Sequence, residues 1–104
     1  MPEDQLTVGV DVGTGSVRAG VFTLDGTMLS SAASDIREFH PKPDFYEQSS
    51  TNIWEETGKV VRQSLREADV SPEDIVGLSF DATCSLVVLD KNDMPLSVAE
   101  TGEP

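Results

Sequence analysis

The chain is poor in the residues that cross-link small proteins or hold metals. Its 104 residues include one cysteine and one histidine, so an internal disulfide is impossible and a four-ligand structural zinc site cannot form. Long apolar runs are also missing, because hydrophobic residues occur in short, separated bursts, and this excludes a membrane-spanning helix of about 20 residues. Stability must therefore come from a hydrophobic core, which is modest in a domain of this size.

Basic residues are scarce as well. Seven lysines and arginines against 19 acids give a net charge of −12, which repels nucleic acid and anionic lipid over most of the surface. We therefore expect neither nucleic acid nor a membrane as a partner, and an anionic ligand only where backbone N–H groups gather. Residues 1–5 carry acids where a secretory signal needs a basic and then an apolar region. We expect a disordered tail at 1–5 and a cytoplasmic protein.

Three strands are predicted in the first third of the chain. Residues 6–11, 17–24 and 27–33 are rich in β-branched and apolar residues and are separated by turn formers. Asp25-Gly26 is a favoured two-residue hairpin turn between the second and third segments. An antiparallel meander of three strands follows from this order.

One helix is predicted in the middle of the chain. Residues 39–46 contain two prolines and no periodicity, which indicates an irregular crossing over the surface. Residues 49–52 offer several helix-capping side chains. Apolar residues then recur at helical spacing from 53 to 68, which predicts an amphipathic helix.

The last predicted elements place two polar segments together. Residues 71–74 form a capped helical turn before the apolar run 75–81, which we expect to be a buried strand parallel to the first. Residues 86–89 predict a fifth strand. The crossover into the parallel strand should be right-handed, and ligands of such α/β sheets gather outside the carboxyl ends of parallel strands. The turn after Asp11 and the loop 81–85 should therefore meet.

The turn between the first two strands is suited to a phosphate. Gly13 and Gly15 allow a tight turn whose N–H groups point into one concavity, and the hydroxyls of Thr14 and Ser16 add further donors. An ordinary hairpin turn, with glycines for geometry and hydroxyls for solubility, is the alternative explanation. We prefer the phosphate interpretation, because residues 11–18 as a whole, from the aspartate through the glycines and hydroxyls to the arginine, resemble a known phosphate motif.

Charged residues at both ends of this turn extend the prediction. The carboxylate of Asp11 would repel a phosphate unless Mg²⁺ lay between them, directly or through water. Arg18 would add positive charge near the site or point to solvent. The residues predicted to hold a phosphate and its Mg²⁺ are Asp11, Gly13, Thr14, Gly15, Ser16 and Arg18, with Asp11 as the metal ligand.

The segment 11–18 resembles the phosphate motif of the actin and hexokinase superfamily, which is shared by filament proteins, chaperone ATPases and acetate kinases. Two further segments narrow this likeness. The chain resembles the beginning of an FGGY-family carbohydrate kinase, and within it the ribulokinase-like branch of the D-ribulokinase type, from about Thr7 onward. The matching segments are Asp-Val-Gly-Thr-Gly-Ser-Val-Arg at 11–18, Tyr-Glu-Gln-Ser-Ser at 46–50, Ile-Trp at 53–54 and Gly-Leu-Ser-Phe-Asp-Ala-Thr-Cys-Ser-Leu-Val-Val-Leu-Asp at 77–90.

The resemblance implies an α/β fold of the ribonuclease H-like (actin/hexokinase-type ATPase) kind, with residues 1–104 as the incomplete N-terminal part of the first kinase domain. It implies an ATP-dependent transfer of the γ-phosphate to a sugar hydroxyl, with a pentulose such as ribulose as the substrate. The catalytic base should lie beyond Pro104. The Gln48 segment either lies near the sugar or caps the helix. The sugar loop supplies the substrate-binding candidates Asp81, Ala82, Thr83 and Cys84.

Several other side chains have ordinary structural explanations. We expect Cys84 to be a small buried hydrophobe if it does not reach the sugar, Trp54 to pack in the core and His40 to lie on the surface. The acid pairs Glu55-Glu56 and Glu73-Asp74 should face solvent or favour helix N-termini.

The kinase hypothesis has two alternatives, and it also predicts how the isolated chain should behave. The chain could instead be a non-catalytic binding module or remnant, or an actin-like or chaperone-type ATPase. A sheet without its later strands would expose a hydrophobic edge. The 104-residue chain should therefore be unstable or associate, for example as a homo-oligomer. We expect it to show no sugar kinase turnover by itself.

Overall fold

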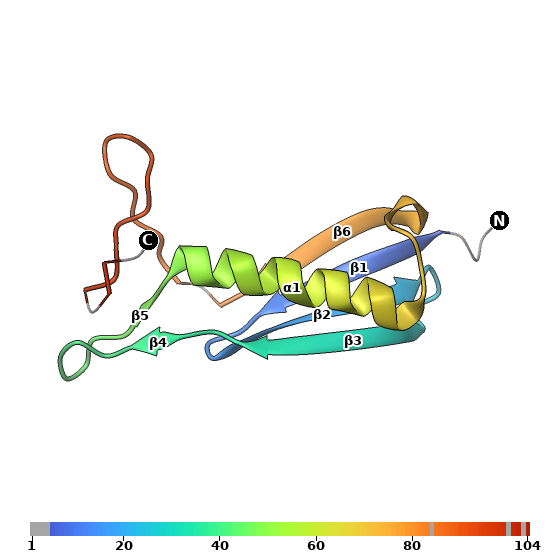
Figure 1. Cartoon of the computed structure of the whole chain (residues 1–104), viewed down its shortest axis with the longest axis horizontal. Helices are drawn as coiled ribbons and strands as arrows, with labels where there is room; N and C mark the ends of the chain where they lie inside the picture. The colour runs from blue at the N-terminus through green and yellow to red at the C-terminus, as the bar shows by residue number, and fades with distance from the viewer. Residues whose placement is uncertain (1–4, 84, 100, 103) are drawn as a thin grey trace.

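The computed structural model describes residues 5–83, 85–99, 101–102 and 104 (Figure 1). A four-stranded sheet carries one long helix on one of its faces, and a small two-stranded sheet lies at one end. Cys84 lies outside the described residues. So do residues 1–4 of the disordered tail expected at 1–5. No helix in the described ranges is long and apolar enough to cross a membrane.

The strand order of the main sheet is β3-β2-β1-β6. The first three strands form the expected antiparallel meander, and β6 pairs with β1 in parallel, also as expected. A small sheet pairs β4 with β5. The bounds are β1 Leu6–Val12, β2 Ser16–Thr23, β3 Met28–Asp35, β4 Glu38–Phe39, β5 Glu47–Gln48, the helix α1 Ser50–Ala68, the short 3-10 helix η2 Pro72–Asp74 and β6 Ile75–Ala82.

The core lies between the sheet and α1. Alternate residues of β1 and β2 point toward the helix, while their neighbours point to the opposite face, which α1 leaves uncovered. The hydrophobic residues buried in this layer are Leu6, Val8, Val10, Val17, Ala19, Val21, Ala32, Ile36 and Val60. The apolar stripe of α1 thus supplies the cover that the meander needs.

Polar contacts tie α1 to the sheet along its length. The buried hydroxyl of Ser64 lies 3.0 Å from the carbonyl oxygen of Ala19 in β2, and the Ser30 hydroxyl donates to the Ser64 carbonyl at 2.6 Å. Because these groups are shielded from water, their hydrogen bonds fix the position of the helix along the strands.

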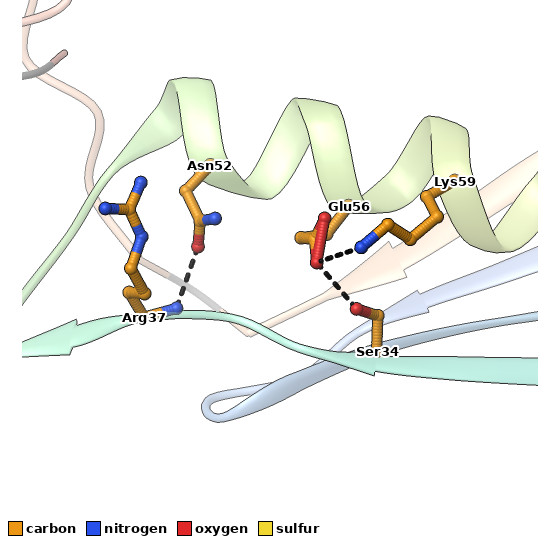
Figure 2. A network of polar contacts seen from close by, with 5 residues as sticks. All are labelled: Ser34, Arg37, Asn52, Glu56 and Lys59. Carbon is orange, nitrogen blue, oxygen red and sulfur yellow. Dashed lines mark hydrogen bonds and ion pairs between the residues drawn. The ribbon is translucent and has the colours of Figure 1, made fainter.

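A second set of contacts joins the start of α1 to β3 and the segment after it (Figure 2). The Arg37 N–H donates to Asn52 Oδ1 at 2.8 Å. Glu56 Oε1 accepts from the Ser34 hydroxyl at 2.7 Å and from Lys59 Nζ at 3.1 Å. These contacts place the N-terminal half of the helix next to the end of the meander.

A bulge near the start of β6 changes the phase of that strand. Ile75 is paired with Leu6, but Gly77 is paired with Thr7, so Val76 is an extra residue. Ile75 therefore packs on the helix side with Leu6. Five residues further along β1 the pairing brings Asp81 beside Asp11 on the opposite, uncovered face.

Two sequence predictions about apolar residues are wrong. Strand β6 is an edge strand, and Leu78 and Phe80 are exposed although they lie level with the buried Val8 and Val10. The reason is that α1 packs chiefly over β2 and β3 and leaves most of β6 uncovered. Trp54, expected in the core, is 74% exposed on α1.

Two predictions about local structure are also wrong. Among the described residues, 86–89 form no strand and contribute a single bridge, Leu89 to Pro95. The β2–β3 hairpin has a three-residue loop, because Thr23 N–H bonds to the Thr27 carbonyl and Gly26 adopts a φ of 92°. The crossing at 39–46 is irregular as predicted, but its flanks pair as β4 and β5.

Candidate functional site

The turn between β1 and β2 holds its carbonyl groups in protein hydrogen bonds. The Gly13 N–H donates to the Ser16 carbonyl at 2.8 Å, and the Gly15 carbonyl accepts from the Ile36 N–H at 3.1 Å. The Thr14 carbonyl accepts from Gln48 Nε2 at 2.7 Å. In the described part of the chain, the N–H groups of Thr14 and Gly15 have no such partner. The turn is therefore left with free donors, which is the arrangement that an anion requires.

The two glycines of the turn are needed for space. Neither has a positive φ, so the conformational freedom of glycine is not what the turn uses. A Cβ atom at Gly13 would stand 3.1 Å from the Ser16 carbonyl oxygen. At Gly15 it would stand 2.7 Å from Glu38 Oε1. Side chains at either position would distort the turn or displace its neighbours.

Residues of the β4–β5 sheet support the turn from the side. The Tyr46 hydroxyl donates to the Thr14 carbonyl at 3.3 Å. Partial removal from water and a hydrogen bond with Glu38 raise the pKa of Tyr46 to about 12. Glu38 was not found from the sequence, because its approach to Gly15 depends on a strand pairing that no local pattern announces.

Three charged residues form a row across the uncovered face of the sheet. Asp81, Asp11 and Arg18 are paired in register on β6, β1 and β2, so their side chains lie on the same side. All three are exposed. They line a hollow of about 480 Å³. The direction of Arg18, which the sequence left open, is thus toward the same face as the two carboxylates.

The two carboxyl groups of the row interact directly. A hydrogen bond with Asp11 raises the pKa of Asp81, and partial desolvation and the negative charge of Asp11 act in the same direction. A pair of this kind favours the arrival of a positive charge, which could be a proton or a metal ion. Oxygen donors are the ligands that Mg²⁺ prefers.

The loop after β6 lies against the turn, as the strand order predicted. The Thr83 N–H donates to the Val12 carbonyl at 3.1 Å and so extends the pairing of β6 with β1. The hydroxyl of Thr83 lies 3.3 Å from that of Ser85. Asp81, Ala82 and Thr83 are exposed at this edge. Cys84 belongs to the same predicted set and lies outside the described residues.

Gln48 joins the turn and this loop. Its Nε2 donates to the Thr14 carbonyl, and its Oε1 accepts from the Ser85 hydroxyl at 3.3 Å. The alternative that the Gln48 segment caps the helix is confirmed, because Ser49 is the cap and its hydroxyl accepts from the Asn52 N–H at 3.1 Å. A cleft of about 360 Å³ lies beside the loop and is bordered by residues 46–48, 50, 53, 85–88 and 95–98.

The chain matches known proteins over almost its whole length. Residues 6–101 match the FGGY family of carbohydrate kinases, N-terminal domain. A Xenopus laevis FGGY carbohydrate kinase domain-containing protein is 46% identical over 97% of this chain and 18% of its own length. The D-ribulokinase of Saccharomyces cerevisiae is 48% identical over 85% of this chain and 12% of its own length.

A solved structure shows the same fold. The xylulose kinase of Rhodospirillum rubrum superposes with a TM-score of 0.78 at 22% sequence identity, over 88% of this chain and 19% of that enzyme. The agreement confirms the α/β sugar kinase fold predicted from the sequence. The chain thus spans less than a fifth of the length of these relatives.

Proposed function

Because the chain belongs to the FGGY family of carbohydrate kinases, we propose that the whole protein transfers the γ-phosphate of ATP to a hydroxyl of a pentulose such as ribulose. One observation carries the proposal: the donor-bearing turn after β1 and the polar loop after β6 lie side by side and are linked through Gln48. A phosphoryl transfer needs its nucleotide and its acceptor held at adjacent places.

The turn is proposed to hold the nucleotide phosphates. The N–H groups of Thr14 and Gly15 and the hydroxyls of Thr14 and Ser16 supply the donors, while Gly13 keeps the turn narrow. Arg18 lies on the same sheet face and supplies positive charge, which matters on a chain with a net charge of −12.

The carboxylate of Asp11 fits a magnesium ion. It is exposed, it lies where β1 enters the turn, and its neighbour Asp81 offers a second set of oxygen donors. When bound, Mg²⁺ supplies neutralisation of the phosphate charge. Asp11 is therefore the proposed metal ligand of this chain.

The loop after β6 is proposed to contact the sugar. Asp81, Ala82 and Thr83 are exposed beside the turn, and Cys84 completes the predicted set. The proposal of ribulose rests on the likeness to the D-ribulokinase of Saccharomyces cerevisiae described above. No residue of this chain is proposed as the catalytic base, which we expect in the remainder of the protein.

The test is a phosphorylation assay of the full-length protein with Mg-ATP. We expect D-ribulose or a related pentulose to give a sugar phosphate, with weaker reaction for xylulose, ribitol and glycerol. Asp11→Asn should abolish most of the activity. Gln63→Ala, on a helix residue whose side chain bonds to Glu67 on the same helix, should not change it. Failure of all these substrates to yield a phosphate ester would contradict the proposed function.

A further inference from the structure

Gln48 contacts other parts of the site and is not itself one of the predicted ligand-binding residues. Its side chain reaches the Thr14 carbonyl and the Ser85 hydroxyl, which belong to the turn and to the loop, respectively. Neither contact is to the position of a phosphate or a sugar. The side chain thus connects the two halves of the site.

The chemistry of the amide determines how it lies. A carbonyl oxygen can only accept, so the NH₂ group of Gln48 must face Thr14, and the amide oxygen is then turned to Ser85, whose hydroxyl can donate. A carboxylate or an apolar side chain of the same length could not make both contacts. The link is specific for a side chain with one donor end and one acceptor end.

The backbone of Gln48 is held from two sides. Gln48 is paired with Glu38 in the β4–β5 sheet, and the next residue, Ser49, is fully buried and caps α1. The side chain therefore extends from a fixed base, and its two hydrogen bonds transmit that position to the turn and the loop.

We propose that Gln48 is a positioning residue that couples the phosphate turn to the sugar loop, so that a nucleotide bound at the turn orders the loop for the sugar. The inference rests on the proposed function. It is carried by the paired contacts at 2.7 Å and 3.3 Å. Loss of the link would leave each half folded but would misplace one relative to the other, and a displacement of about 1 Å can lower a rate roughly 100-fold.

The first test is kinetic and uses the full-length protein. Gln48→Met keeps the length of the side chain and removes both contacts. Ser85→Ala keeps the contact of Gln48 with Thr14 and removes the contact with the loop, together with the contact between the Ser85 and Thr83 hydroxyls. We expect each to lower kcat/KM for the sugar roughly 10-fold or more, with an unchanged melting temperature. The double variant should lose little more than Gln48→Met alone, because both changes break one link.

The matched control is Gln63→Met, which replaces a glutamine of α1 whose amide bonds to Glu67 on the same helix and, among the described residues, makes no contact with the turn or the loop. It should retain wild-type kinetics. Gln48→Met with kinetics within about twofold of wild type, or additive losses for Gln48→Met and Ser85→Ala, would overturn the inference. A loss matched by an equal fall in thermal stability, with no change specific to the sugar, would also overturn it.

The second test does not depend on turnover. In hydrogen exchange, Mg-ATP alone should slow exchange of the wild-type amides at residues 13–16 and also at residues 85–88. In Gln48→Met it should protect only the first segment. Equal protection of both segments in the variant would count against the coupling. A wild-type protein that phosphorylates no sugar would contradict the proposed function, and the inference would fall with it.

Discussion

Asp11 and Asp81 are paired on the parallel strands β1 and β6, and the nearness of Asp11 raises the pKa of the Asp81 carboxyl. Two ionised carboxylates placed side by side repel each other, so this position favours a positive charge between them. The neighbouring turn supplies N–H donors and Arg18 supplies positive charge. The sheet therefore places an acidic pair directly beside a turn with free N–H donors, a combination that a magnesium–phosphate complex would satisfy.

Asp11→Asn should lower the pKa of Asp81, because it removes the acidic partner that raises it. In the wild-type chain the folded state holds this proton more tightly than the unfolded state. Stability should therefore fall as the pH rises from the usual aspartate range through the raised pKa. In Asp11→Asn this fall in stability with rising pH should be absent. Carbon NMR titration of the Asp81 carboxyl, in metal-free buffer, measures the change. An Asp81 pKa that is the same in both proteins would contradict the prediction.

Glu56 should give the opposite pH dependence. The hydrogen bond from Ser34 and the contact with Lys59 lower its pKa (Figure 2). Its contribution to stability is therefore present above the usual glutamate range and is lost as the pH falls through the lowered pKa. In Ser34→Ala the loss should begin at a higher pH. Urea unfolding at a series of acidic pH values tests this, and identical pH profiles for the two proteins would argue against it.

Two glycine replacements should have separate effects. Gly26 has a φ of 92° and open space around it, so Gly26→Ala should reduce stability by about 1 kcal/mol. Gly13→Ala forces a Cβ against the Ser16 carbonyl in the turn and should weaken Mg-ATP binding about 10-fold or more. Calorimetric titration with Mg-ATP measures binding by both variants. Weakened binding in Gly26→Ala, or normal binding in Gly13→Ala, would be evidence against the assigned roles.

Ser64→Ala should reduce the free energy of unfolding by about 1 kcal/mol, since it removes a buried hydroxyl that bonds across to β2. Gln63→Ala, one residue away on α1, is the control and should change stability by less than about 0.5 kcal/mol. Chemical denaturation of both variants provides the comparison. Equal stabilities for the two would show that the Ser64 contact does not hold the helix to the sheet.

The apolar edge of β6 should make the 104-residue chain associate. Leu78 and Phe80 are exposed on the outer strand of the sheet. Leu78→Ser and Phe80→Ser together should therefore lower the sedimentation coefficient toward that of a monomer. Leu24→Ser, which changes an exposed leucine of the β2–β3 hairpin loop, is the control. A wild-type chain that sediments as a monomer at high concentration would contradict the prediction.

The sequence allowed the order of the elements to be predicted because local patterns determine it. The glycines of the turn, the capping residues before α1 and the alternating strand 6–11 each carry their own signal. The meeting of the turn and the loop after β6 also followed, since two parallel strands end at the same edge. Burial was predicted less well. Phe80 and Trp54 are apolar, but their exposure depends on which surfaces the remaining elements cover.

The support of the turn could not be predicted from the sequence. Glu38 and Tyr46 reach Gly15 and Thr14 across more than twenty residues of sequence, through a pair of two-residue strands. Strands this short have no detectable periodicity. The role of Gln48 as a link was hidden for the same reason, although its segment resembled that of the family.

The extra residue at Val76 restricts how β6 can change length. In a regular strand Ile75 and Asp81, which are six positions apart, would lie on the same face. Here Ile75 packs against the core on one face, and Asp81 lies beside Asp11 on the other face. Deleting Val76 would force β6 to give up either its contact with Leu6 or its pairing with Asp11. We therefore expect β6 to accept many substitutions at its exposed positions but no single-residue insertion or deletion between Ile75 and Asp81.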